Sequence, residues 1–209
     1  MHRLLITVNI LIMTHAIKRH LLQAVFLVPF IVNAAPALAD NDGPFFGQYA
    51  AGKWMIGAKA AKVQNGSDGF KDGNGTGLIL GYEFARPVGY DGSVSIEVEL
   101  LKSGNAAVDP ASSFLSGGAV GEWDADITNV FFAYRSPGTV YFKGKLGFQR
   151  SQVQLKIPGF SSESDDVSMA WGAGLGLRLG EWGLIEAEYS TGTATNDIGL
   201  ISVNAVATF

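Results

Sequence analysis

Alternation of apolar and polar residues is the main pattern in this chain, and residues 140–149 show it clearly. Phe142 and Leu146 belong to the apolar set of this segment, and Lys143 and Lys145 belong to the other set. Because successive side chains of a β-strand point to opposite faces, the segment has one apolar face and one charged face. The apolar face could pack on the core of a soluble sandwich. It could also face lipid, with the lysines in the lumen of a barrel.

Similar alternation recurs along the chain and predicts eight β-strands. The expected strands are residues 54–61, 76–86, 93–102, 123–135, 140–149, 167–179, 184–191 and 198–209. Their lengths suit the roughly 9–11 residues that a tilted strand needs to cross a membrane. Long polar segments alternate with short turns between the strands, which is typical of transmembrane barrels. The expected long loops include residues 64–75, 103–122 and 154–166. The pattern therefore predicts an all-β fold, an eight-stranded antiparallel up-and-down transmembrane β-barrel.

The beginning of the chain has a different character. Lys18 and Arg19 precede an apolar run at residues 21–32, and small residues follow at 34–39. A basic region, an apolar run and a small-residue cleavage site together indicate a secretory signal peptide. A membrane anchor is the alternative interpretation. The run is short for a membrane span and contains Pro29, so we expect cleavage instead.

These features divide the chain into three expected parts. Residues 1–39 form the signal peptide, and translation begins at Met1 or at Met13. Residues 40–52 form a periplasmic segment that leads into the barrel. Residues 53–209 form the outer-membrane β-barrel itself.

Composition excludes several classes of function. The chain contains no cysteine, so neither disulfides nor thiol chemistry are available. Residues 1–39 hold three basic residues and no acidic one, which leaves 12 basic and 19 acidic residues, a net charge of −7, in the remainder. A nucleic-acid partner is therefore not expected. All three histidines also lie in residues 1–39. The mature chain consequently lacks the histidine of a Ser-His catalytic arrangement, and we expect no catalytic, cofactor-binding or metal site.

Charged residues fall on the inward-facing positions of several expected strands. The expected lumen charge network consists of Lys59, Glu83, Glu97, Glu99, Lys143, Lys145, Arg178, Glu186 and Glu188. An eight-stranded barrel is just wide enough to be filled by side chains, and charges are tolerated there only if they are paired. The pairs Glu97–Glu99 and Glu186–Glu188 could perform acid–base chemistry. We favour a structural role, in which the network forms an ionic plug.

Three other patterns have simpler interpretations. The glycines of residues 172–176 do not follow the spacing of a nucleotide-binding loop, so we interpret them as small residues inside a narrow barrel. The acidic residues 163, 165 and 166 do not match a calcium-binding loop and indicate a solvated loop. Six aromatic residues could stack on a ligand, but an aromatic girdle at the membrane interfaces is preferred. They are Trp54, Tyr82, Tyr134, Trp171, Trp182 and Tyr189.

The C-terminal segment carries a family resemblance. Residues 201–209 alternate between apolar and polar side chains and end on Phe209. This resembles the C-terminal strand of bacterial outer-membrane barrels. The resemblance implies that Phe209 is an assembly signal read by the barrel-assembly machinery. The segment 129–134, followed by a short turn and a glycine-rich strand, is similar to the small OmpA/OmpX-type barrel domain of Gram-negative bacteria. The resemblance covers about residues 52–209.

Together these features predict a non-enzymatic outer-membrane protein that displays surface loops in a structural or surface-interaction role. A porin-like channel for small solutes is the first alternative. A soluble periplasmic ligand-binding barrel is the second. The expected partners are outer-membrane lipid, lipopolysaccharide, the barrel-assembly machinery and an unknown surface ligand, and no cofactor is expected.

Overall fold

The computed structural model describes residues 49–50, 52–66, 69–84, 86–87, 92–108, 121–193 and 198–209. The chain divides into two compact units, residues 1–49 and 50–209, and the fold described below is that of the second. The expected signal peptide, residues 1–39, lies outside the described residues, as does most of the segment 40–52. The boundaries of these two parts therefore stay predictions.

The described residues contain eleven strands. They are β1 (Tyr49–Ala50), β2 (Lys53–Asn65), β3 (Gly73–Glu83), β4 (Arg86–Pro87), β5 (Ser93–Ser103), β6 (Ala106–Val108), β7 (Gly121–Arg135), β8 (Val140–Ile157), β9 (Phe160–Arg178), β10 (Gly183–Gly192) and β11 (Ile198–Thr208). Short strands β1 and β4 form a separate two-stranded sheet. In this described part of the chain, no helix is long and apolar enough to cross a membrane.

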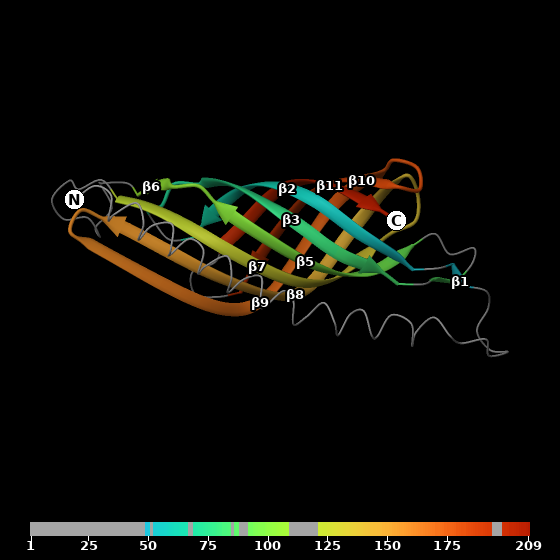
Figure 1. Ribbon diagram of the computed structural model, residues 1–209, viewed down its shortest axis with the longest axis horizontal. Helices are drawn as coiled ribbons and strands as arrows, with labels where there is room; N and C mark the ends of the chain where they lie inside the picture. The colour runs from blue at the N-terminus through green and yellow to red at the C-terminus, as the bar shows by residue number, and fades with distance from the viewer. Residues whose placement is uncertain are drawn as a thin grey trace, which may run out of the picture. The chain divides into compact units, whose positions relative to one another are not determined.

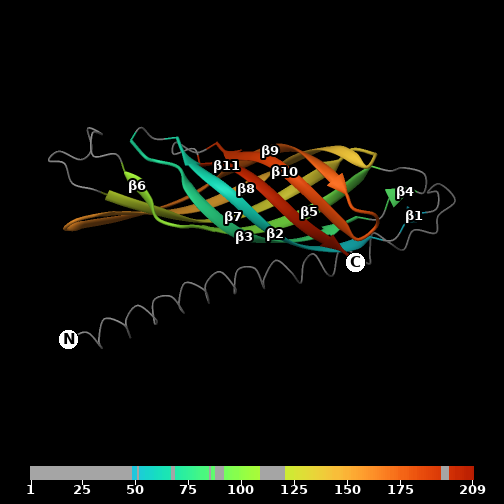
Figure 2. The ribbon, with the colours of Figure 1, turned by 90° about the horizontal axis from the view of Figure 1, so that it is seen from above.

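Eight of these strands form a closed barrel, as Figures 1 and 2 show. Strands β2, β3, β5 and β7 to β11 pair antiparallel in chain order, and β11 pairs with β2 to complete the circle. At the closing seam, Trp54 N donates to Phe209 O at 2.8 Å, and Phe209 N donates to Trp54 O at 3.0 Å. The predicted eight-stranded antiparallel up-and-down barrel is confirmed.

Alternating burial separates the two faces of each strand. On β7, the Phe131 side chain is fully buried, whereas its neighbour Phe132 is 57% exposed. The apolar set of β8 between residues 140 and 148 is likewise exposed, and Lys143 and Lys145 are buried. Since a strand alternates its side chains, a barrel with an apolar exterior must take the intervening polar residues inside. The exterior is thus suited to lipid.

The barrel has two different ends. The turn end carries the short connections at residues 136–139 and 179–182, and the loop end carries β6 and the tip of the β8–β9 hairpin. Each end has an apolar cluster inside. The Trp123 cluster, at the loop end, consists of Ala61, Val63, Leu101, Ala106, Val108, Trp123, Ala125, Ile127, Leu155, Ile198 and Leu200. The Met55 cluster, at the turn end, consists of Met55, Ile79, Tyr141, Leu184 and Val206.

The β8–β9 hairpin corrects one prediction. Residues 154–166, expected to be a polar loop, belong to β8 and β9 except for the turn at Pro158 and Gly159, where Gly159 has φ +82°. Figure 1 shows this hairpin extending beyond the other strands. The physical reason is that the outward face of this part is polar, so that it lacks the apolar alternation of the membrane-facing strands. Its inward face retains apolar residues, among them Leu155.

The expected loop at residues 103–122 also contains a strand. Strand β6 pairs with the beginning of β7, and Ala106 lies opposite Trp123. The other edge of β6 contacts residues that precede β3. Phe70 forms a β-bridge with Val108, and Lys71 N donates to Ala107 O at 3.0 Å. At the loop end, β6, β7, β8 and β9 therefore form one sheet. Phe70 and Lys71 cover its β6 edge.

Candidate functional site in the barrel interior

Eight charged side chains meet in the middle of the barrel, between the two apolar clusters. They are Lys59 from β2, Glu97 and Glu99 from β5, Arg135 from β7, Lys143 and Lys145 from β8, and Glu186 and Glu188 from β10. All eight are buried. Four basic and four acidic residues give this interior network a formal charge of zero. We call these eight residues the ionic network.

The half of the network nearer the turn end is organised around Arg135. Its Nε donates to Glu186 Oε1 at 2.8 Å, and its Nη2 donates to Glu97 Oε1 at 2.6 Å. Its Nη1 donates to Ser95 Oγ at 2.8 Å. Lys143 Nζ donates to Glu97 Oε2 and Glu186 Oε2, both at 2.8 Å. Each of these two carboxylates therefore binds both cations, which is how buried ions are compensated.

Lys143 links this half to the half nearer the loop end, because its ammonium also donates to Glu188. Lys145 Nζ donates to Glu188 Oε2 and to Glu99 Oε1, both at 2.7 Å. Lys59 Nζ lies 2.7 Å from Glu99 Oε2, an ion pair without hydrogen-bond alignment, and 3.5 Å from Glu188 Oε2. The acids and bases thus form one connected chain across the lumen.

Neutral polar groups complete the coordination of these acids. Ser95 Oγ donates to Glu97 Oε1 at 2.9 Å, and Asn129 Nδ2 donates to Glu99 Oε2 at 3.1 Å. The Tyr141 hydroxyl donates to Glu186 Oε1 at 2.8 Å. The carboxylates of Glu97, Glu99 and Glu186 thus already accept hydrogen bonds from neighbouring groups. This arrangement suits a structural role better than acid–base chemistry.

The glycines of residues 172–176 give these long side chains their space. A Cβ added at Gly172 would lie 2.7 Å from Lys145 Cε. One added at Gly176 would lie 2.2 Å from Tyr141 Cζ. Any larger residue would collide with the side chains that cross the lumen. The interpretation of these glycines as small interior residues agrees with this arrangement.

The structure also shows where the remaining expected residues lie. Glu83 is buried near the turn end, opposite Lys53 and Ser95 in the strand register. Arg178 is half-buried at the same end: its Nε donates to Gly138 O at 3.2 Å, and its guanidinium lies 4.8 Å from the centre of the Tyr141 ring. Arg178 is therefore not among the eight residues of the ionic network.

Arg135 is the network residue that sequence reasoning missed. It shares the inward parity of Asn129 and Phe131, whereas Phe132 and Tyr134 form the outward set. Recognising the aromatic residues as membrane-facing would have placed Arg135 inside. Its position as the last residue of β7 disguised this parity, because strand ends are the least certain part of a sequence-based prediction.

Phe209, the expected assembly signal, follows β11 at the turn end and its side chain is 72% exposed. Its backbone is held by Trp54 at the barrel seam, as described above. The side chain is therefore accessible in the folded barrel, and its role in assembly stays a prediction.

Polar interactions continue on the outer face near the loop end. Arg150 Nη2 donates to Asp165 Oδ2 at 2.5 Å, and Lys156 Nζ donates to Asp124 Oδ2 at 2.8 Å. The hydrogen bonds that the Arg150 guanidinium donates to Asp165 raise the pKa of this guanidinium above its usual range. The expected acidic loop is thus part of a paired strand surface. Among the described residues, no group of three or more acidic or histidine side chains is arranged to hold a metal ion.

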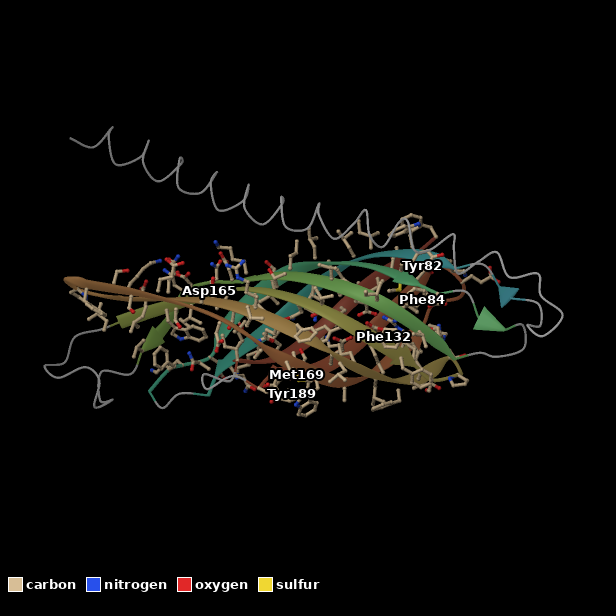
Figure 3. The ribbon with its side chains drawn as sticks, turned by 90° about the horizontal axis from the view of Figure 1, so that it is seen from below. Tyr82, Phe84, Phe132, Asp165, Met169 and Tyr189 are labelled. Atoms are coloured by element: carbon tan, nitrogen blue, oxygen red, sulfur yellow. The ribbon has the colours of Figure 1, made fainter. Side chains whose placement is uncertain are left out.

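Aromatic side chains form two groups on the exterior. Near the turn end, Trp54 contacts Tyr82 with ring centres 5.0 Å apart, and Tyr82 contacts Phe84 at 5.7 Å. Nearer the loop end, Trp171 contacts Tyr189 at 6.0 Å. Figure 3 shows Tyr82 and Phe84 close together and Tyr189 apart from them. Two separate groups on an apolar exterior fit a girdle better than a single ligand-stacking set.

Comparisons with known proteins bear on this architecture. Residues 25–208 match the outer membrane protein beta-barrel domain family. No relative is found among the curated proteins. Among solved structures, the chain is similar to Ail, the attachment invasion locus protein of Yersinia pestis, with 21% identity, a TM-score of 0.49, and coverage of 76% of this chain and 97% of that one.

Two structures from Pseudomonas aeruginosa are also similar. The outer membrane protein OprG has 14% identity and a TM-score of 0.45, with coverage of 78% of this chain and 98% of that one. The N-terminal beta-barrel domain of OprF has 12% identity and a TM-score of 0.44, with coverage of 74% and 97%. The predicted outer-membrane localisation is confirmed by the family match, which removes the soluble periplasmic barrel as an alternative. Because this match spans most of its length, the chain belongs to the outer membrane protein beta-barrel domain family.

Proposed function

We propose that this protein is a non-enzymatic barrel with a closed interior that presents a protruding strand surface to the outside of the cell. The observation that carries the proposal is the filled lumen. Four basic and four acidic side chains bind one another across it, with a net charge of zero. The expected ionic plug and the expected surface role are both parts of this proposal.

Closure of the lumen is supported by layers of different chemistry. The ionic network spans the middle, and its hydrogen bonds join β5, β7, β8 and β10. The Trp123 cluster fills the loop end, where the Trp123 indole Nε1 donates to Lys71 O at 2.9 Å and its ring packs against Phe70. A solute would have to separate paired ions and also displace packed apolar side chains. Both steps are costly, which argues against an open channel.

The outward-extending sheet supports a surface role. Within the described residues, β10 reaches β9 only as far as Ala170. Thr193 N donates to Met169 O at 2.8 Å. The backbone N–H and C=O groups of Met169, and of every second residue along β9 from it, therefore point toward the side on which β10 pairs. In the part of β9 that β10 does not reach, the residues whose backbone groups point this way include Ser161 and Glu163. A strand edge of this kind can pair with an extended segment of another chain.

Conductance in planar lipid bilayers tests the closed interior. The reconstituted wild-type barrel is expected to show no steady current above that of the protein-free membrane. A large and persistent open state would contradict the proposal and would make the small-solute channel the better assignment.

Cysteine labelling on intact cells tests the surface display. The natural chain has no cysteine, so a single introduced thiol is specific. Ser162→Cys on the protruding hairpin should react with a membrane-impermeant maleimide, because its side chain is exposed. Thr139→Cys, in the exposed turn at the opposite end, is the matched control and should react only after the outer membrane is permeabilised. The reverse pattern would show that the proposed orientation is wrong.

A further inference from the structure

The protruding part of β9 has an edge that no other strand covers within the described residues. Strand β10 pairs with β9 only as far as Ala170, and Thr193 N donates to Met169 O just beyond it. Four residues separate Thr193 from Ile198, where β11 begins, so this connection spans at most about 18 Å. Glu163 lies about 20 Å beyond Met169 along β9, so the connection is too short to reach it and return.

The other edge of β9 keeps this segment extended. It pairs with β8 along the whole protruding part, which Figure 1 shows as the long hairpin. Pro158 and Gly159 form the turn of the hairpin, and Gly159 has a φ of +82°, which glycine adopts at little cost. Arg150 Nε donates to Asp165 Oδ1 at 3.0 Å across the two strands. A strand that is already ordered loses little conformational entropy when another segment pairs with it.

Acidic side chains lie beside the uncovered edge. Residues 160–169 contain Glu163, Asp165 and Asp166 and no basic residue. Asp165 binds Arg150, whereas Glu163 forms no ion pair within the described residues. Opposite charges on neighbouring strands stabilise their pairing, and like charges destabilise it. The edge therefore favours a partner strand with lysine or arginine opposite Glu163, whereas a second copy of β9 would bring like charges together.

The inward face of the same segment has small side chains with apolar residues behind them. Ser162 and Ser164 are exposed, and their partners on β8 are Leu155 and Val153. Phe160, at the end of this face, is 57% exposed. Because serine is small, a long apolar side chain of an added strand can lie over it toward the apolar residues of β8. The inward positions of a partner strand are therefore best filled by apolar residues.

We infer that the β9 edge binds an extended polypeptide segment of about eight residues, in which basic and apolar side chains alternate, as a further strand of the sheet. The backbone of this segment pairs with the uncovered groups of β9. Its basic side chains lie beside Glu163, and its apolar side chains lie over Ser162 and Ser164. This inference rests on the proposed surface role and names the chemistry of the partner. In strand addition of this kind, backbone hydrogen bonds supply affinity and alternate side chains supply specificity.

Fluorescence anisotropy on the reconstituted wild-type protein tests the inference. The protein is placed in nanodiscs of zwitterionic lipid, and the probe is a labelled eight-residue peptide of alternating lysine and valine. This peptide should bind saturably and more strongly than it binds to empty nanodiscs, and a peptide with glutamate in place of lysine should not. Binding no stronger than that to empty nanodiscs, or equal binding of the two peptides, would overturn the inference.

Methylation of the peptide backbone tests whether the peptide is bound as a strand. In an antiparallel pairing, the lysines opposite Glu163 and its alternate neighbours exchange both backbone hydrogen bonds with β9, and the valine amides point away. Methylation of the lysine amides should therefore weaken binding by at least about tenfold, because several backbone hydrogen bonds are lost. Methylation of the valine amides should be tolerated. The reverse result would support a parallel pairing, and equal affinities of the two methylated peptides would rule out strand addition.

Charge reversal at the edge locates the site. Glu163→Lys should weaken binding of the lysine peptide about tenfold, because an attractive cross-strand pair becomes a repulsive one. Glu122→Lys is the matched control, since Glu122 is exposed on the outward face of β7, in the same sheet but two strands from the edge. The control should change the affinity less than about twofold, because salt screens charges at that distance. Equal weakening by the two variants would show that the peptide follows the general charge of the sheet and not the β9 edge.

The proposed function and this inference can fail separately. Both faces of a nanodisc are open to the peptide, so binding does not depend on which side of the membrane the hairpin occupies. Absence of cysteine labelling on intact cells would overturn the surface display alone, and absence of peptide binding in nanodiscs would overturn the inferred partner alone.

Discussion

Arg135 shows how much one side chain can determine in a narrow lumen. Its guanidinium binds Glu97, Glu186 and Ser95 from two other strands. A planar donor group with several N–H bonds in fixed directions suits this bridging role better than a lysine ammonium does. The position is therefore sensitive to changes in both charge and shape.

Replacement of Arg135 by methionine should strongly destabilise the barrel. The change leaves Glu97 and Glu186 with one cation fewer in a buried site, and the loss of one partner from a buried ion pair typically costs about 3–5 kcal/mol. The free energy of unfolding, measured by urea titration of the reconstituted barrel, checks this. Arg178→Met is the matched control, because Arg178 is half-buried and binds backbone carbonyl oxygens. Equal losses in the two variants would contradict the central role of Arg135.

An interior glycine can tolerate substitution as poorly as a buried charged residue does. Gly176→Ala places a methyl group against the Tyr141 ring and should displace the ring, with loss of its hydrogen bond to Glu186. Overpacking of this kind costs about 1–3 kcal/mol. Gly144→Ala is the control, because the nearest atom to its added Cβ is Phe142 Cε1 at 3.5 Å. Thermal unfolding should separate the two variants, and similar midpoints would count against the steric argument.

At the scale of the strand, predictability follows from the contrast between the two faces. The strand β8 was recognisable near Phe142 and Lys143, because one face is apolar for lipid and the other is charged. The same strand was not recognised beyond residue 149, because its outward side chains there, such as Gln154 and Lys156, are polar. Nothing in the composition distinguishes such a polar strand from a loop; the difference lies in its pairing with Glu163 and its neighbours on β9.

The ionic network was only partly predictable for a related reason. Parity along a strand assigns Lys145 and Glu188 to the lumen, and both are buried there. Parity alone does not assign height along the barrel axis, which depends on the stagger between strands. Arg178 shares the inward parity but lies at the turn end, away from the network. Which acid pairs with which base in the ionic network could therefore be determined only from the three-dimensional register of the strands.

The exterior of β9 gives a prediction at this scale. Leu175→Arg places a charge on the exposed apolar face, where a lipid-facing arginine costs about 2–4 kcal/mol near the middle of the bilayer. Ser162→Arg, on the protruding part of the same strand, should change stability little, because its side chain is already exposed beyond the apolar band. The yield of folded barrel in lipid vesicles, read from heat-resistant migration on gels, compares the two. A similar yield for both would show that Leu175 does not face lipid.

For the whole molecule, the proposed closure of the lumen rests on two kinds of interior layer that act as barriers in series. The Trp123 cluster and the ionic network lie at different heights and depend on different interactions. Loss of either one alone leaves the other to block the lumen. The proposal therefore predicts that closure is robust to single substitutions.

Bilayer conductance of combined variants tests this arrangement. Trp123→Ala and Lys143→Met should each remain closed, whereas the double variant should show a raised current. Folded barrel must first be verified for each variant, because removal of a buried tryptophan costs about 3–5 kcal/mol. A fully open pore in Lys143→Met alone would show that the apolar cluster is not a barrier.

The seam between β2 and β11 determines when the barrel can form during biogenesis. The two strands that close it are the first and the last of the eight barrel strands in sequence order, and the backbone of Trp54 bonds to that of Phe209. Until β2 and β11 are both present, the chain has two unpaired strand edges. The closing contact also joins residues that are far apart in the sequence, and such distant pairings form slowly. The nascent protein therefore has to be protected from aggregation for as long as its final strand is missing.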